Sequence, residues 1–279
     1  SGERCSGDAC WPITMVAAAP LPIDACARGA PIAIIDTGID SAHPALAGAR
    51  IERQRFTRPG LPTAPADHGT ALAALLVGQV AENGSALAPG ATLLAAEAFA
   101  LRGGEPVADA ETLLAALDWT ISRGARVIGM SLAGSENRLL GRGIALATRR
   151  ANILAAAGNE GPRAPAAFPG AHPDVIAVSA VDARRRAWRG ANRGDYVELT
   201  APGVGILSAA PGGALRDWTG TSFAVPFAMA AALRARAETG GDPQAARRLL
   251  ASWALDLGAP GRDPLFGYGL VRAKGSRCW

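Results

Sequence analysis

Short runs of apolar residues, continuous rather than alternating, constrain this chain more than any other feature. They recur along the sequence and are separated by longer stretches, rich in Ala, Leu and Arg, that have helical periodicity. A strand that is apolar at every position is buried on both faces, and such strands occur in parallel sheets that helices cover on each side. We therefore predict an α/β fold with a doubly wound, mostly parallel central sheet and helices on both faces.

These runs set the expected elements. The strands are expected at 32–36, 91–99, 125–132, 152–157 and 174–181, and the helices at 69–80, 109–123, 138–150, 223–238 and 243–255. Ligands of such sheets sit beyond the carboxyl ends of the strands. Asp36 and Asn159 lie at two of these ends, so they are the first candidates for site residues.

Length and charge suit a single globular domain. The chain has 279 residues, 49% of them apolar, which is enough for a sizeable core. We expect one domain over 1–279, with residues 1–30 as an N-terminal arm. The net charge is only +4 and the densest basic run, 184–186, is short, so nucleic-acid binding is not expected. No apolar stretch reaches the roughly 18 residues of a membrane span.

Four cysteines near the chain ends predict the compartment. They lack the paired spacing and the neighbouring histidines of a zinc site, so no metal site is expected there. Two disulfides fit better and indicate an oxidising compartment, hence a secreted protein, extracellular or periplasmic. The chain begins without Met or an apolar leader, so we expect a processed form. The three possible pairings stay open, and the cysteines are Cys5, Cys10, Cys26 and Cys278.

The stretch IAIIDTGID at 32–40 raises the question of an aspartic protease. Such enzymes present a catalytic carboxylate as Asp-Thr-Gly after an apolar strand, as at Asp36. They need two carboxylates that share one proton, and the chain contains no second Asp-Thr-Gly or Asp-Ser-Gly. The homodimeric solution suits much shorter, all-β chains. Asp36 therefore needs partners of another kind.

Two further polar residues stand at the starts of predicted helices. His68 directly precedes one helix, whereas His43 and His172 each precede a proline and are expected to be turn residues. Ser222 opens an apolar helix, with Pro226 expected in the first turn, where its missing N–H costs nothing. Taken alone, His68 can be structural and Ser222 an N-cap. A nucleophile at that place would also benefit from the free N–H groups of the helix start.

Four motifs in order connect these residues. IAIIDTGID, DHGTALAALL, AAAGNEG and GTSFAVPFAMA resemble the subtilisin-like serine proteases, and similar segments between and after them extend the resemblance over roughly 30–272. The resemblance implies that Ser222 is the nucleophile, that His68 is its general base, and that Asp36 orients the imidazole and balances its charge. It also implies that the Asn159 side-chain amide and the Ser222 backbone N–H stabilise the oxyanion.

The chain departs from the family pattern at Ala71, at Phe223 in place of a Met, at Val225 in place of a small residue, and in one loop. Ala71 replaces a second histidine, which has no role in the proton transfers. The loop GQVAENGSALAPG is shorter than, and unlike, the asparagine-rich loop that holds calcium in many members. Glu82 and Asn83 could bind a metal, but we expect no calcium in the 79–88 loop and no required cofactor.

By resemblance, an extended substrate adds a strand to two edges, 131–134 and 100–104, and places the side chain before the scissile bond in a slot. The floor of this slot is expected at Ala167, with Ala166 as the alternative register. A cis peptide is implied between Phe168 and Pro169. The binding residues so implied are Ser131, Leu132, Ala133, Gly134, Ala156, Ala157, Gly158, Ala167, Ala100, Leu101, Arg102 and Gly103.

Three functions use this fold in different ways. The main hypothesis is a secreted serine endopeptidase that acts on proteins or peptides through an acyl-enzyme. A peptide ligase or macrocyclase would use the same triad, with an amine in place of water. A non-catalytic binding protein is expected to lack a catalytic residue, and all four are present. The resemblance also implies a propeptide that inhibits the enzyme and assists folding, and we expect a monomer.

Overall fold

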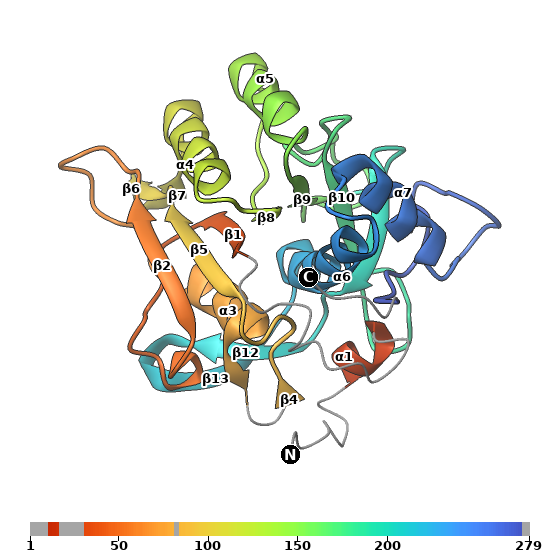
Figure 1. Ribbon diagram of the computed structural model, residues 1–279, viewed down its shortest axis with the longest axis horizontal. Helices are drawn as coiled ribbons and strands as arrows, with labels where there is room; N and C mark the ends of the chain where they lie inside the picture. Colours follow the sequence, from red (N-terminus) through yellow and green to blue (C-terminus); the bar gives the residue numbers. More distant parts are fainter. Residues whose placement is uncertain (1–10, 17–30, 81–83, 275–279) are drawn as a thin grey trace.

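Seven parallel strands form the central sheet (Figure 1). The computed structural model describes residues 11–16, 31–80 and 84–274. Across the sheet the order is β11-β10-β9-β8-β1-β5-β2, and each neighbouring pair is parallel. The predicted fold class is confirmed. The strands are β1 (Pro31–Asp36), β2 (Arg50–Arg55), β5 (Thr92–Glu97), β8 (Val127–Met130), β9 (Asn152–Ala156), β10 (Ile176–Val181) and β11 (Val197–Pro202).

Helices cover both faces of the sheet. On one face lie α3 (Asp67–Val77) and α6 (Thr221–Glu238), with α7 (Pro243–Trp253) packed on α6. On the other face lie α4 (Ala110–Ser122) and α5 (Arg138–Ala147), which pack together at the top of Figure 1. Every residue of α6 from Thr221 to Arg236 is buried, so this helix is enclosed on all sides.

The strand β1 shows why the apolar runs are continuous. Ile32 and Ile34 belong to the core beneath α3 and α6, and Ala33 and Ile35 belong to the core beneath α4 and α5. None of these four side chains is more than 2% exposed. Successive side chains of a strand point to opposite faces, so a strand between two helical layers is apolar throughout.

The remaining elements are short. Within the described ranges, no helix has the length and apolar character that crossing a bilayer requires. The short elements are the helices α1 (Trp11–Val16), η2 (Pro44–Leu46) and η4 (Pro211–Gly213), and three antiparallel hairpins, β3 (Gln79–Val80) with β4 (Gly84–Ser85), β6 (Ala100–Arg102) with β7 (Glu105–Val107), and β12 (Ile206–Ala210) with β13 (Ala214–Trp218).

All five predicted strands and all five predicted helices are present, but two strands of the sheet were not predicted. The strand β2 reads Arg-Ile-Glu-Arg-Gln-Arg and lies at the sheet edge, where most of its side chains are exposed. An exposed edge strand has no continuous apolar run. The strand β11 is buried throughout, but Glu198 and Thr200 interrupt its apolar pattern.

The order of the strands places a switch point at β1. The strands β5 and β2 lie on one side of β1, and β8 to β11 follow on the other. In open α/β sheets, ligands bind beyond the carboxyl ends of the strands at such a point. Asp36 is the last residue of β1, so the topology puts it at the expected place for a site.

The helix α6 begins two residues earlier than predicted, which changes the role of Pro226. Because α6 starts at Thr221, Pro226 lies beyond the first turn, where an N–H would bond the Ser222 carbonyl four residues back. The expectation of a cost-free first-turn proline was therefore wrong. The Ser222 carbonyl instead accepts the Ser131 hydroxyl at 3.1 Å.

Candidate active site

Asp36 and His68 form the central contact of the site. His68 lies in the first turn of α3, and its Nδ1 is 2.7 Å from Asp36 Oδ1. The Asp36 carboxylate is buried and also accepts the Thr37 N–H at 2.7 Å. Since a carboxylate only accepts, Nδ1 of His68 carries the hydrogen and Nε2 of the neutral ring keeps its lone pair. The contact therefore fixes the tautomer of a base.

The main chain holds these two side chains together. The Gly69 N–H donates to Thr37 Oγ1 at 3.0 Å, which ties the start of α3 to the residue after Asp36. A Cβ atom on Gly69 would lie 2.6 Å from the Gly38 carbonyl oxygen and 2.7 Å from that of Thr37. Glycine at position 69 is thus required for this close approach.

Opposing effects act on the His68 imidazole. Burial disfavours the charged ring and lowers its pKa, whereas the charge and hydrogen bond of Asp36, and the charge of Asp67, raise it. The net result is a pKa above the usual 6.5. The His68 side chain is still 30% exposed, and Phe223 packs edge-on against the ring with centroids 5.4 Å apart. The ring is therefore held in place yet open to a substrate.

Ser222 is the second residue of α6 and directly precedes Phe223, whose ring contacts His68. The N-cap of the helix is Gly220, so the interpretation of Ser222 as an N-cap is wrong. The Ser222 hydroxyl donates to the Ser131 carbonyl at 3.3 Å, and the Ser131 hydroxyl donates to the Ser222 carbonyl. In the first turn, the Ser222 N–H has no acceptor within the helix, so it is available to an anion.

Asn159, just beyond β9, contacts the same helix start. Its Oδ1 accepts both the Thr221 N–H at 3.0 Å and the Thr221 hydroxyl at 2.7 Å. Its Nδ2 lies near Gly220, since a Cβ atom there would be 3.6 Å away. With the amide oxygen engaged, Nδ2 is the group that remains to donate. Asn159 Nδ2 and the Ser222 N–H are thus two donors at one helix start.

Thr221 is a residue whose role the sequence analysis missed. Besides Asn159, its hydroxyl contacts Gly158, accepting the N–H at 3.2 Å and lying 3.3 Å from the carbonyl oxygen. It therefore joins the start of α6 to the loop that carries Asn159. The available signal was a second hydroxyl directly before Ser222 in the Gly-Thr-Ser motif.

Small residues form one wall of the predicted slot. Gly158 has a left-handed φ of 110°, and a Cβ atom there would lie 2.5 Å from Asn192 Nδ2. Tyr196 donates its hydroxyl to the Ala157 carbonyl at 2.5 Å and supports the wall from behind. Neither Asn192 nor Tyr196 was predicted, because each acts through a hydrogen bond to a residue far away in the sequence.

The predicted floor of the slot lies against this wall. Ala167 is 7% exposed, whereas Ala166 is exposed, which favours Ala167 as the residue that points inward. A Cβ atom on Gly170 would lie 2.8 Å from the Ala156 carbonyl oxygen and 3.3 Å from that of Ala167, so the two segments meet there. The predicted cis peptide Phe168–Pro169 is confirmed.

The predicted opposite wall is the edge at 131–134. Gly134 exchanges both main-chain hydrogen bonds with Phe168, at 2.8 and 3.0 Å. Because successive residues of an extended chain point to opposite edges, the polar main-chain groups of Ala133 point away from Phe168. Ala133 is exposed and Leu132 is half-buried. This edge therefore offers main-chain groups to a strand, and substrate binding there stays a prediction.

The second predicted edge, 100–104, differs from the expectation. On one side Ala100–Arg102 pairs with β7, and on the other the Leu101 N–H donates to the Pro62 carbonyl at 2.8 Å while Ala100 bridges Thr63. Strand addition at Ala100 and Leu101 is therefore blocked, because both of their edges are already paired. Contact with a substrate at Gly103, in the hairpin turn, stays a prediction.

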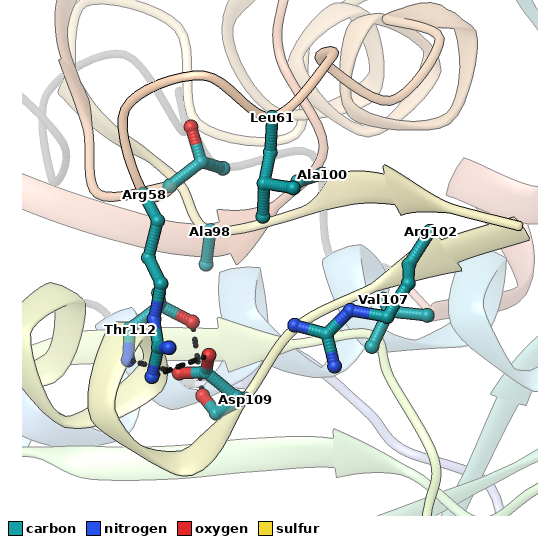
Figure 2. A pocket seen from close by; sticks show the side chains of 9 residues that line it. Arg58, Leu61, Ala98, Ala100, Arg102, Val107, Asp109 and Thr112 are labelled. Atoms are coloured by element: carbon teal, nitrogen blue, oxygen red, sulfur yellow. Dashed lines mark hydrogen bonds and ion pairs between the residues drawn. The ribbon is translucent and has the colours of Figure 1, made fainter.

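Figure 2 shows the small pocket behind this hairpin. Arg58 reaches Asp109 at 3.3 Å, and Asp109 caps α4 by accepting the Thr112 N–H at 3.0 Å. Arg102 and Ala100 line the same pocket, whose volume is about 10 Å³. That is room for about one water molecule, so the pocket does not take a side chain.

The other two histidines are turn residues, as predicted. His43 Nδ1 accepts the Ala45 N–H at 3.1 Å, and His172 Nδ1 accepts the Asp174 N–H at 3.2 Å.

Some predictions concern residues that lie outside the described part of the chain. These residues are the four cysteines of the predicted disulfides, and Glu82 and Asn83 of the 79–88 loop. In the described part of the 79–88 loop, residues 86–88 are apolar and buried, and the expectation of no calcium in this loop stays a prediction.

Known proteins resemble this chain over most of its length. The minor extracellular protease Epr of Bacillus subtilis is 33% identical over 214 residues, or 74% of this chain and 32% of Epr. The intracellular serine protease of Paenibacillus polymyxa is 32% identical over 214 residues, or 71% of this chain and 64% of that protein. The chain thus spans less than two thirds of either relative.

Solved structures of proteases also resemble this chain over most of its length. Sphericase has a TM-score of 0.81 and 27% identity, covering 97% of this chain and 100% of its own. The prenylagaramide maturation protease PagA has a TM-score of 0.77 and 26% identity, covering 90% and 93%. A model of the subtilase family matches residues 27–269. The ordered motifs, the switch-point site and these matches lead to one conclusion: the chain belongs to the subtilase family.

Proposed function

We propose that this chain is a serine endopeptidase that uses Asp36, His68 and Ser222 as a triad and forms an acyl-enzyme. The observation that carries the proposal is the 2.7 Å contact between His68 Nδ1 and Asp36 Oδ1, which leaves Nε2 as a base beside the start of α6. That the relatives are named proteases supports it.

Acylation begins when the Ser222 hydroxyl gives its proton to His68 Nε2. The hydroxyl first has to leave the Ser131 carbonyl, its acceptor in this structure. Its oxygen then attacks the scissile carbonyl carbon, and the resulting oxyanion is stabilised by the Ser222 N–H and by Asn159 Nδ2. The C–N bond breaks as His68 donates the proton to the leaving amine, while Asp36 balances the imidazolium charge.

Deacylation repeats these steps with water. A water molecule gives a proton to His68 Nε2 as its oxygen attacks the acyl carbon. The Ser222 oxygen then leaves and regains the proton from His68, which restores the enzyme.

Two kinds of measurement test the triad. Ser222→Ala and His68→Ala should each remove most peptidase activity, and the double variant should be little worse, because the residues act as a unit. A fluorophosphonate should label the wild type at Ser222 and leave Ser222→Ala unlabelled, whereas a statine should not inhibit. Statine inhibition with resistance to the fluorophosphonate would return Asp36 to the aspartic-protease interpretation.

Product masses with an amine-bearing peptide present would separate hydrolysis from ligation.

We further propose a secreted monomer that acts on proteins or peptides, is made with an inhibitory propeptide and requires no metal. The cysteine pattern motivates secretion, while the relatives include one protein named extracellular and one named intracellular. Thiol titration tests the disulfides, light scattering the oligomeric state, and activity after chelator treatment the metal requirement. Activity lost on chelation and restored by Ca²⁺ would overturn the last point.

A further inference from the structure

A pocket of about 330 Å³ lies next to His68, and the mechanism above does not use it. Asp40, His43, Asp67, Thr70 and Pro211 are among its lining residues. Sites for small molecules have volumes of about 300–1,000 Å³, so this pocket can admit a single long side chain. Asp67 directly precedes His68 at the start of α3, so the pocket lies at the helix end that carries the proposed base.

The charged groups of this Asp40–Asp67 pocket are carboxylates. In the part of the chain that the structure describes, no arginine or lysine forms an ion pair with Asp40 or Asp67. His43 adds no charge: its Nδ1 accepts an N–H, while its Nε2 lies 3.1 Å from the carbonyl oxygens of Ala210 and Ala214. These bonds fix a neutral imidazole that donates from Nε2. The pocket is therefore anionic.

The two carboxylates are held on one rigid support. The Asp40 N–H donates to Thr70 Oγ1 at 2.8 Å, and the Thr70 hydroxyl donates to the Ala66 carbonyl at 2.6 Å. Thr70 is buried in α3, the helix that Asp67 begins. The loop with Asp40 and the helix with Asp67 are thus joined, so their main chains need little ordering when a cation binds, and the Asp40 carboxylate is oriented by the Ala42 N–H at 3.0 Å.

The proton transfer to the leaving amine indicates which part of a substrate lies near this pocket. His68 protonates the leaving amine, so the segment after the scissile bond departs on the imidazole side of the site. The segment before that bond pairs instead with the open edge at 131–134. Phe223 contacts both the His68 ring and the tilted Trp218 ring, the latter with centroids 5.0 Å apart. Trp218 and Pro211 lie at opposite ends of the β12–β13 hairpin, so the hairpin runs from the side of His68 to the pocket.

We propose that the Asp40–Asp67 pocket is a subsite for one arginine or lysine side chain of the substrate, within the first four positions after the scissile bond. Asp40 and Asp67 are then specificity-determining residues. The inference rests on the proposed peptidase function and adds a substrate class to it.

Internally quenched peptides test the subsite. Peptides that share one sequence before the scissile bond carry Arg or Gln at each of the four following positions in turn. At one position kcat/KM should favour Arg by about three- to tenfold, as expected for one or two partly exposed ion pairs. The preference should shrink as salt is raised from 0.05 to 0.5 M, since salt screens such pairs.

Substitutions then assign the preference to the pocket. The double variant Asp40→Asn/Asp67→Asn should bring the Arg-to-Gln ratio close to one. The ratio is the proper readout, because Asp67 also acts on His68 and its loss changes the rate with every peptide. Asp118→Asn, an exposed carboxylate on α4 at the other face of the sheet, is the matched control and should keep the wild-type ratio.

Two results would overturn the inference: a ratio near one at all four positions, or a preference that survives both substitutions. A p-nitroanilide substrate separates this failure from a failure of the proposed function, because it has no peptide after the scissile bond. Hydrolysis of the anilide without an Arg preference would refute only the subsite. No hydrolysis of any substrate would refute the peptidase itself.

Discussion

Removing the Thr221 hydroxyl should slow the chemical step without weakening substrate binding. In Thr221→Val, Asn159 Oδ1 loses the 2.7 Å hydrogen bond from the Thr221 hydroxyl and keeps the 3.0 Å bond from the Thr221 N–H. The contacts of that hydroxyl with Gly158 are lost as well. The Asn159 amide then turns more freely, and its Nδ2 spends less time on the oxyanion.

The expected loss of transition-state stabilisation in Thr221→Val can be compared with two known costs. Net loss of one neutral hydrogen bond costs about 0.5–1.5 kcal/mol. Complete loss of an oxyanion donor costs about 2.7–4 kcal/mol in subtilisin, a member of this family, where it was measured. One of the two bonds that orient Asn159 survives, so we expect about 1–2 kcal/mol, or roughly a 5- to 30-fold fall in kcat with little change in KM.

Steady-state kinetics with a peptide anilide measures the effect, and two further variants assign it. Thr221→Ser keeps the hydroxyl and should retain most of the wild-type kcat. In an Asn159→Ala background, Thr221→Val should cost nothing more, because the group it orients is gone. Equal losses in the Val and Ser variants, or a full additional loss in the Asn159→Ala background, would refute this reasoning.

Three further predictions concern pH, specificity and the cysteines. His68 accepts the Ser222 proton only in its neutral form, and its pKa lies above 6.5, so kcat/KM should rise with pH with a midpoint above 6.5. Asp67→Asn removes a charge that raises the His68 pKa and should move this rise to lower pH. An optimum near pH 4 would contradict the mechanism. Substrates with Ala, Leu or Met before the scissile bond should be cleaved better than those with Phe or Tyr. Ala167→Gly should shift the ratio of kcat/KM values by roughly 10- to 200-fold toward the aromatic substrates. A wild type that prefers Phe tenfold over Leu would show that the floor of the slot is misassigned. Thiol titration of the unreduced protein should find no free cysteine, and reduction should lower its stability by about 2–4 kcal/mol per bridge; two or more free thiols would count against secretion.

Features that follow from burial and local sequence were predictable. The continuous apolar strands predicted the parallel sheet, and Asp36 and Asn159 lie near the strand ends where such sheets bind ligands. The start of α6 was misplaced because its first residues serve contacts made far away in the sequence. Ser131 satisfies the carbonyl that Pro226 leaves free, and no local pattern around Pro226 indicates that partner.

Features that depend on long-range pairing were not predictable. The Leu101 N–H bonds the Pro62 carbonyl, so a strand that looks free in sequence is enclosed in the structure. Tyr196 and Asn192 reach the predicted slot through hydrogen bonds to Ala157 and Pro165, which lie more than 25 residues away in the sequence. The Asp40–Asp67 pocket likewise arises only when the loop after β1, the start of α3 and the β12–β13 hairpin come together.

The enclosure of α6 links activity to the cooperative unfolding of the whole sheet. Ser222 stands on a helix whose residues are buried from Thr221 to Arg236, so that helix cannot fray or detach without exposing the core on its side of the sheet. Its amide hydrogens beyond the first turn should therefore exchange with solvent only through global opening, with protection that equals the full free energy of unfolding. A denaturant titration should accordingly lose nucleophile labelling and helical signal at one midpoint, with no inactive but folded species between them.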